Sequence, residues 1–274
     1  MASQVTFIGA GNMASAIIGG MIESGYPRDA ITATAPHEDA LAPIRERLGI
    51  HTSTDNAAAV SEADVVVLAV KPQIMHDVCA GLRDAVQAHK PLILSVAAGL
   101  SADTLEAWLG GELAVVRCMP NTPSLVGAGA AGLYANGRVD GDQRRLATEL
   151  LEAVGLVEWV EEEALLEAVT AVSGSAPAYF FLMFEAMEEA GAKLGLPADT
   201  ARRLAMQTAF GAARMAMDSD KTPGELKRNV MSPGGTTERA IAHLEDAGLR
   251  RIMAEAMDAC ATRAREMAEE LGKR

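Results

Sequence analysis

The stretch Val5 to Glu23, VTFIGAGNMASAIIGGMIE, decides how the first part of this chain folds. A β-favouring run leads directly into G-x-G-x-x-A, formed by Gly9, Gly11 and Ala14, and an apolar helical stretch follows. The first glycine permits a tight turn, the second lets the backbone approach a pyrophosphate, and the small third residue lets the helix pack on the strand. The helix N-terminus adds unpaired N–H groups and the positive end of a dipole. The stretch predicts a dinucleotide site, with a structural turn or a methyltransferase as alternatives.

Strand-like and helical stretches alternate from residue 4 to about 160. The strand-like runs are 5–8, 30–33, 65–70, 92–97, 114–118, 130–134 and 157–160. VVVLAV is apolar at every position, as in a parallel strand covered on both faces. Beyond 161 only helices are expected, at 162–192, 198–217, 223–229, 236–246 and 249–271. We therefore predict an α/β fold, with a Rossmann-type, doubly wound, mostly parallel sheet in residues 1–161 and an all-helical domain in residues 162–274.

Composition excludes several classes of protein. The chain has 274 residues and a formal charge of −13, which opposes binding to nucleic acid or an anionic membrane. Its three cysteines form no CxxC pair and its five histidines show no metal-ligand spacing, so neither a disulfide framework nor a metal site is predicted. It opens without a secretory signal, and no apolar run is judged long enough to span a bilayer, so we expect a soluble cytoplasmic protein.

Residues after the later strands are candidates for cofactor binding, because open α/β sheets bind ligands at the carboxyl ends of their strands. Val70, Lys71 and Pro72 follow one strand, Ala98 the next, and Asn121 the one after that. The Asn121 amide offers a donor and an acceptor for a nicotinamide carboxamide. Lys71 is either a catalytic acid or a residue that positions phosphate or backbone.

The second strand-like run bears on the choice of cofactor. It ends in Thr-Ala-Pro-His, without the carboxylate that binds the ribose 2′-hydroxyl in NAD sites. Glu38 and Asp39 lie a little beyond the expected point, and no arginine sits there in the sequence. A missing carboxylate removes repulsion of a 2′-phosphate, so NADP is favoured over NAD. His37 is either a phosphate neighbour or an ordinary loop histidine.

The helical half carries apolar groups that suggest contact with a second subunit. Tyr179, Phe180, Phe181 and Phe184 lie within six residues, which fits either a buried core helix or an interface. Alanines at 201, 205, 209 and 213 form a ladder that permits close helix packing. Packing between subunits is the favoured interpretation. SGSAPAY, at 173–179, predicts a kink in a long helix.

Several motifs together resemble one family. GAGNMA at 9–14, the Asp-Asn pair at 55–56, AVKPQ at 69–73, SVAAG at 95–99, RCMPNTP at 117–123, SGSAPAY at 173–179 and SPGGTT at 232–237 strongly resemble the pyrroline-5-carboxylate reductase family, in its order and over essentially the whole chain. The resemblance implies an oxidoreductase that reduces 1-pyrroline-5-carboxylate to L-proline with NAD(P)H, the last step of proline biosynthesis. It also implies a helical dimerisation domain and a homodimer through the C-terminal helices, with dimers often assembled into a decamer.

The resemblance also assigns roles to residues by matching position, with NADPH as cofactor and NADH as an open alternative. The expected cofactor residues are Gly9, Ala10, Gly11, Asn12, Met13, Ala35, His37, Asn56, Val70, Lys71, Pro72, Ala98, Asn121 and Asn229. The expected substrate residues are Glu163, Gly235, Thr236 and Thr237, with Thr237 nearest the ring nitrogen as the catalytic residue.

The chemistry of a cyclic imine fits these residue types. Hydride adds most easily to a protonated C=N, so orientation and a hydrogen-bond partner matter more than a strong acid. Gly234 and Gly235 let backbone N–H groups reach the substrate carboxylate at a helix start, while a threonine hydroxyl meets the nitrogen. The alternative is that Thr236 or Thr237 only caps the helix. The Glu-Glu-Glu run that ends at Glu163 is by default a solvated surface.

Two rival functions remain open from sequence. One is a dehydrogenase of another small acid, of the hydroxyisobutyrate type, for which Lys193 or Lys221 could be nominated although neither lies in a matching motif. The other is a non-enzymatic module that senses the dinucleotide through its dimer, and it leaves SPGGTT without a role.

Overall fold

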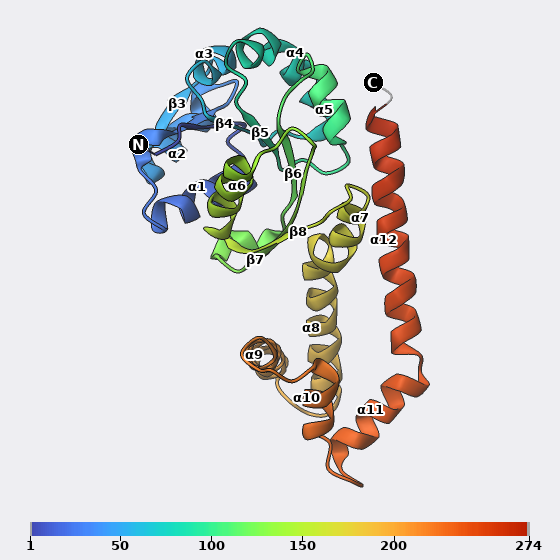
Figure 1. Ribbon diagram of the computed structural model, residues 1–274. Helices are drawn as coiled ribbons and strands as arrows, with labels where there is room; N and C mark the ends of the chain where they lie inside the picture. The colour runs from blue at the N-terminus through green and yellow to red at the C-terminus, as the bar shows by residue number, and fades with distance from the viewer. Residues whose placement is uncertain (1, 273–274) are drawn as a thin grey trace. The chain divides into compact units, whose positions relative to one another are not determined.

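The computed structural model describes residues 2–272, and its contacts divide the chain into two compact units (Figure 1). We call them the sheet unit, which comprises residues up to Ser175 and those from Ala259 on, and the helical unit, Ala176–Asp258. Each unit is described by itself.

One eight-stranded sheet forms the centre of the sheet unit, in the order β3-β2-β1-β4-β5-β6-β7-β8. All neighbouring strands are parallel except β6 and β7, which are antiparallel. This confirms the predicted fold class. The strands are β1 (Val5–Ile8), β2 (Ile31–Thr34), β3 (His51–Ser53), β4 (Val65–Leu68), β5 (Leu92–Ser95), β6 (Val115–Met119), β7 (Gly129–Ala135) and β8 (Gly155–Trp159).

Helices cover both faces of this sheet, which explains why the central strands are apolar throughout. Phe7 of β1 belongs to a core cluster with residues of α1 and α6, whereas Ile8 belongs to a cluster with residues of α4 and α5. The helices are α1 (Asn12–Glu23), α2 (Glu38–Leu48), α3 (Asn56–Val60), α4 (Pro72–His89), α5 (Ala102–Trp108), α6 (Gly141–Glu152) and α7 (Leu165–Val169), with short 3-10 turns at Arg28–Ala30 and Thr122–Val126.

The expected helix at 162–192 is interrupted at a turn that overlaps the start of the predicted kink at 173–179. After α7 the chain forms a π-helical turn, Thr170–Gly174, in which the Ser175 N–H donates to the Thr170 carbonyl over 2.8 Å. The helix then resumes as α8. Such π turns are single-turn insertions that often occur at functional sites. The small residues of SGSAPAY therefore mark a change in the hydrogen-bond pattern of the helix.

The helical unit contains α8 (Ala176–Lys193), α9 (Ala198–Met217), α10 (Pro223–Asn229), α11 (Thr236–Asp246) and the first part of α12 (Leu249–Gly272). The alanine ladder packs α9 closely on α8 at its first two positions, because Ala201 and Ala205 are buried. A Cβ added at Gly191 would lie 2.8 Å from the Ala201 Cβ, so the two helices approach where only small residues fit.

The units do not part at the predicted domain boundary of 161 and 162. Residues 162–175 belong with the sheet, because α7 and the π turn pack on β7, and the last part of α12 also belongs with it. The strand pattern ends at 161, but the compact sheet unit does not. The compact units therefore have other bounds than the predicted domains, and the division into two domains at residues 161 and 162 stays a prediction.

Two expectations about apolar surface need correction. Contrary to the sequence-based expectation, one helical run, Leu165–Lys193, is long and apolar enough by length and composition to cross a membrane. This is weak evidence for a span, since helices of soluble proteins pass the same test. The alternative of a buried core helix is also wrong for the single chain, because Phe180 and Phe181 are about 60% exposed and only Ala176 of α8 is buried. The apolar side chains of α8 are therefore largely exposed in the single chain.

Candidate functional site

The turn between β1 and α1 has the shape that a dinucleotide phosphate requires. Gly9 has φ +103°, and its N–H donates to the Thr34 carbonyl of β2 over 3.1 Å. A Cβ there would lie 2.7 Å from the Ala69 carbonyl oxygen, so only glycine fits. A Cβ at Gly11 would meet nothing within 4 Å, and α1 begins there without a capping side chain. The free N–H groups of α1 therefore face open space, which fits a pyrophosphate.

The other predicted cofactor residues of the sheet unit follow the carboxyl ends of neighbouring parallel strands. Ala35 and His37 follow β2, Lys71 is the N-cap of α4 after β4, and Ala98 follows β5. Asn56 begins α3 after β3, and Asn121 follows β6. The sheet order places β2, β1, β4, β5 and β6 side by side, so these residues share one edge of the sheet. Of the predicted cofactor residues, Asn229 at the end of α10 is the one in the helical unit.

Asn121 is tied into the fold more than the sequence indicates. Its side-chain Nδ2 donates to the Ser173 carbonyl over 3.1 Å, and its Oδ1 accepts from the Ala130 N–H over 2.9 Å. The residue is buried. Because the amide oxygen accepts one hydrogen bond and one N–H is engaged, the second N–H and the second lone pair of the oxygen are left for a nicotinamide carboxamide.

An arginine does lie beside the end of β2, contrary to the sequence reading. Arg45 Nη2 donates to Glu38 Oε1 over 2.5 Å, and Arg45 Nη1 donates to Thr52 Oγ1 over 2.8 Å. The sequence analysis did not single out Arg45, because Arg45 lies two helical turns along α2 from Glu38. The seven-residue spacing is the signal that could have found it, since such residues share one helix face.

Glu163 is held in a partly buried ion pair with a residue that sequence reasoning did not single out. Its Oε1 accepts from Arg117 Nη1 over 2.8 Å and from the Ala102 N–H over 2.6 Å. The Glu163 side chain is 25% exposed and the Arg117 side chain is 15% exposed, so Glu163 is not part of a solvated surface. Burial raises the pKa of Tyr134, and the negative charge of Glu163 adds to this rise. Arg117 Nε is buried without a hydrogen-bond partner.

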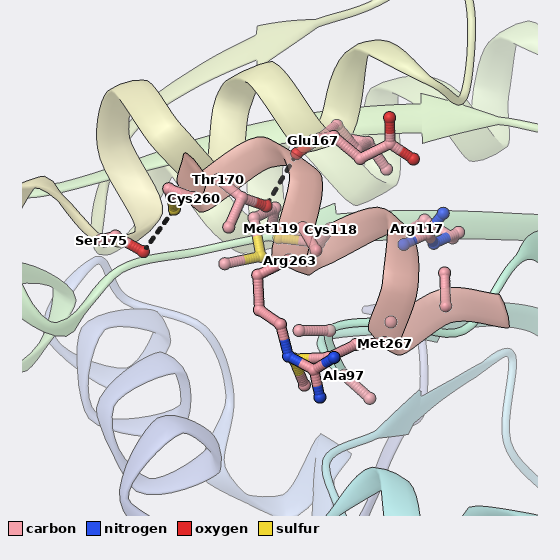
Figure 2. Close-up of a pocket in the computed structure, with 15 residues that line it drawn as sticks. Ala97, Arg117, Cys118, Met119, Glu167, Thr170, Ser175, Cys260, Arg263 and Met267 are labelled. Carbon is pink, nitrogen blue, oxygen red and sulfur yellow. Dashed lines mark hydrogen bonds between the residues drawn. The ribbon is translucent and has the colours of Figure 1, made fainter. Parts of the chain in front are cut away.

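A cavity of about 280 Å³ opens at the carboxyl ends of β5 and β6 (Figure 2). Its walls are mostly apolar, and the Cys260 thiol donates to Ser175 Oγ over 3.2 Å at one side. Burial raises the pKa of the Cys118 thiol, which keeps it protonated and unreactive. Arg263 is held by Glu270 and Glu266, and these hydrogen bonds raise the pKa of its guanidinium. Ala98 lines the cavity, which lies at the sheet edge where the predicted cofactor residues gather.

The Ser232–Thr237 turn lies in the helical unit and begins α11. Gly234 has φ +71°, and its N–H donates to Glu238 Oε2 over 2.7 Å. Gly235 is the N-cap of α11, and no side chain caps the helix. Neither Thr236 nor Thr237 therefore serves as the helix cap, which removes the structural alternative for their hydroxyls. Thr237 is half-buried and Thr236 is exposed.

Family models match both parts of the chain. The model described as pyrroline-5-carboxylate reductase dimerisation matches residues 163–267, and the model described as NADP oxidoreductase, coenzyme F420-dependent, matches residues 4–99. A protein named pyrroline-5-carboxylate reductase from Pseudomonas aeruginosa is 50% identical over 270 residues, which cover 98% of both chains. The chain belongs to the pyrroline-5-carboxylate reductase family. A relative with the same name from Vibrio alginolyticus is 46% identical over 96% of this chain and 97% of its own length.

Solved structures of this family share the fold. A pyrroline-5-carboxylate reductase from Coxiella burnetii superposes with a TM-score of 0.95 at 47% identity, covering 98% of this chain and 99% of that chain. A pyrroline carboxylate reductase from Plasmodium falciparum, solved with NADP bound, gives a TM-score of 0.84 at 27% identity, covering 97% of this chain and 98% of that one. Membership of the family thus extends over both units.

Proposed function

We propose that this chain reduces the C=N bond of 1-pyrroline-5-carboxylate to give L-proline, the last step of proline biosynthesis, with hydride from NADPH. The observation that carries the proposal is the 50% identity to a reductase of that name over 98% of both chains. The relative's name gives the reaction. The glycine-rich turn after β1 would bind the cofactor, and the glycine-rich turn before α11 would bind the substrate. A hydroxyacid dehydrogenase has no comparable support, because Lys193 and Lys221 still lie in no motif.

The sheet unit would hold the cofactor along one edge. The turn from Gly9 to Met13 offers free N–H groups for the pyrophosphate, and the residues after β2 would meet the ribose. Ala98 and Asn121 follow β5 and β6, where the nicotinamide would lie. The nicotinamide ring supplies a hydride when the cofactor is bound.

The start of α11 would hold the substrate. The N–H groups of Thr236 and Thr237 suit a carboxylate, since no side chain caps this helix, whereas the Gly235 N–H already donates to the Ser232 carbonyl over 2.9 Å. The Thr237 hydroxyl, free of a capping role, would hydrogen-bond to the ring nitrogen and orient the imine. Glu163, in the sheet unit, stays a predicted substrate residue, and Arg117 fixes its carboxylate. Residues 2–272 contain no cluster of three or more side chains that could hold a metal ion.

NADPH is the proposed cofactor, with NADH as a weaker second one. The end of β2 carries Ala35 in place of the carboxylate that NAD sites use. The related structure from Plasmodium falciparum contains NADP.

The helical unit would form a homodimer in a soluble, cytoplasmic protein. Phe180, Phe181 and Leu182 of α8 are at least 60% exposed, and Phe210 of α9 is 67% exposed, so the single chain leaves a large apolar surface in water. The family model matched there is described as a dimerisation domain. Assembly of dimers into a decamer rests on the family resemblance alone.

One assay tests the proposal. Purified protein is given pyrroline-5-carboxylate with NADPH or with NADH, and oxidation is followed at 340 nm alongside 3-hydroxyisobutyrate with NADP. We expect imine-dependent oxidation and no turnover of the hydroxyacid. Cofactor binding without turnover of either substrate would favour the dinucleotide-sensing module instead.

A further inference from the structure

The end of β2 carries a charged pair that the proposed function does not yet use. Arg45 and Glu38 form an ion pair on α2, with their side chains 48% and 57% exposed. Arg45 also donates to the Thr52 hydroxyl on β3. One guanidinium contact is to Glu38, which follows the carboxyl end of β2. The other is to Thr52 on β3, the edge strand of the sheet.

The geometry of α2 explains how Arg45 reaches this place. Glu38 is the first residue of α2, and His37 before it follows β2. Arg45 lies about 10 Å further along the helix axis, on the same face. Side chains of a helix lean toward its N-terminus, so the long arginine extends back to Glu38. Thr52 fixes the guanidinium against β3. Within the sheet, Thr52 pairs in register with Ala33 of β2.

In folds of this kind the end of β2 meets the ribose that carries the 2′-substituent. A carboxylate there binds a 2′-hydroxyl and repels a 2′-phosphate, whereas an arginine accommodates the phosphate. This chain has both groups, and each is exposed enough to meet a ligand. The N-cap His37 makes no side-chain hydrogen bond to α2, so the first N–H groups of the helix add to the attraction for an anion.

We infer that Arg45 recognises the 2′-phosphate of NADPH and that its pairing with Glu38 neutralises the carboxylate that would otherwise favour NADH. The inference rests on the proposed function for its cofactor. Without Arg45, the carboxylates of Glu38 and Asp39 stand uncompensated beside the ribose. Without the Glu38 carboxylate, Arg45 keeps its charge and the repulsion of phosphate decreases.

Binding of two cofactor fragments to the full-length protein tests this inference without catalysis. The fragments are adenosine 2′,5′-bisphosphate and 5′-AMP, which differ by the 2′-phosphate, and calorimetry gives each Kd. We expect Arg45→Met to weaken binding of the bisphosphate by about tenfold or more, as for loss of a charge-assisted contact, with little change for 5′-AMP. Glu38→Gln should tighten binding of the bisphosphate by roughly two- to fivefold.

Arg47→Met is the matched control. Arg47 lies on the same helix and carries the same charge. It is two residues further along α2, so its side chain points to another face, and it forms no ion pair within residues 2–272. An equal loss for Arg45→Met and Arg47→Met would show only a general effect of charge and would overturn the inference. An unchanged ratio of the two Kd values in Arg45→Met, or weaker bisphosphate binding in Glu38→Gln, would also overturn it.

The reductase assay separates failure of the inference from failure of the proposed function. If wild-type protein turns over no imine but Arg45→Met still loses bisphosphate binding selectively, the proposed reaction is wrong and the inference stands. If the imine is reduced but the two Kd values move together, the reaction stands and the assignment of Arg45 is wrong.

Discussion

Gly9 and Gly11 are two residues apart in one motif, yet the structure gives them different tasks. Gly9→Ala should destabilise the fold, because the new Cβ would lie 2.7 Å from the Ala69 carbonyl oxygen and 2.9 Å from Val70 Cγ1. Gly11→Ala should leave the fold intact, because its Cβ would meet no atom of this chain within 4 Å. The space at Gly11 is where a pyrophosphate is expected, so this variant should lose cofactor affinity instead.

The size of the Gly9 effect follows from two terms. Its φ of +103° lies outside the left-handed region that alanine tolerates best, which costs about 1–3 kcal/mol. Overlap with the backbone of Ala69, which directly follows β4, costs about 1–3 kcal/mol more. We therefore expect Gly9→Ala to lower the free energy of unfolding by roughly 2–6 kcal/mol. Gly11→Ala has an ordinary φ of −76° and should change it by less than about 1 kcal/mol.

Urea unfolding and titration with NADPH measure the two outcomes separately. Gly9→Ala should shift the urea midpoint down, while Gly11→Ala should keep the midpoint and raise the Kd for NADPH by about tenfold or more, as for lost backbone contacts to phosphate. Equal stability of Gly9→Ala and wild type would contradict the close approach of Gly9 to the Ala69 backbone. Unchanged NADPH binding by Gly11→Ala would contradict the assignment of the pyrophosphate to this turn.

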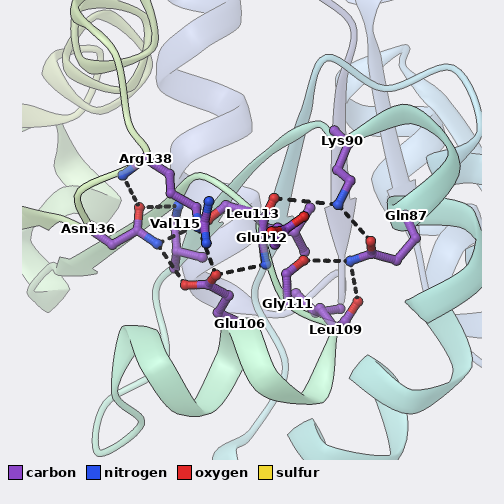
Figure 3. A network of polar contacts seen from close by, with 10 residues as sticks. All are labelled: Gln87, Lys90, Glu106, Leu109, Gly111, Glu112, Leu113, Val115, Asn136 and Arg138. Atoms are coloured by element: carbon purple, nitrogen blue, oxygen red, sulfur yellow. Dashed lines mark hydrogen bonds and ion pairs between the residues drawn. The ribbon is translucent and has the colours of Figure 1, made fainter.

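Three further predictions concern other parts of the chain. Thr237→Ala should lower kcat/KM for the imine by about 10²-fold with its far-UV spectrum unchanged, and an unaltered kcat/KM would remove Thr237 from the mechanism. Asn136→Ala should lower the free energy of unfolding by about 2–4 kcal/mol in urea, because it breaks the buried amide network of Figure 3; a loss below about 1 kcal/mol would refute that role. Burial raises the pKa of Cys118 and raises that of Cys79 to about 12, so at pH 8 a thiol reagent should modify at most Cys260 in native protein and all three cysteines after denaturation.

Buried strands were predictable because their burial shows directly in the sequence. Both faces of β4 are covered, so each of its residues must be apolar, and the predicted run of 65–70 contains the whole strand. β3 was missed because its three residues, His51–Ser53, are at the edge of the sheet and none is buried. Only its pairing with β2 makes it a strand, and a hydrophobic pattern cannot report that.

The candidate site was predictable where it depends on chain position, and was missed where it depends on side-chain reach. Ala98 and Asn121 follow strands, so the strand pattern alone places them at the ligand edge. Arg45 and Arg117 reach their partners across two helical turns and across 46 residues of sequence, respectively. The seven-residue spacing of Glu38 and Arg45 could have shown that they share a helix face, but no local pattern records the contact of Arg117. The same limit applies to Glu163, which an acidic run places in solvent and a distant arginine draws into the fold.

The end of β6 also fixes the helix that leads into the helical unit. Arg117 on β6 holds Glu163 just before α7, and Asn121 beyond the strand holds the Ser173 carbonyl in the π turn after it. Two contacts from one strand end therefore fix α7 at both of its ends. The edge expected to bind nicotinamide is the same edge that anchors this helix, so a change at either contact should alter cofactor geometry as well as stability. The Ser173 carbonyl is available to Asn121 because Pro177, four residues further along, has no N–H to donate to it.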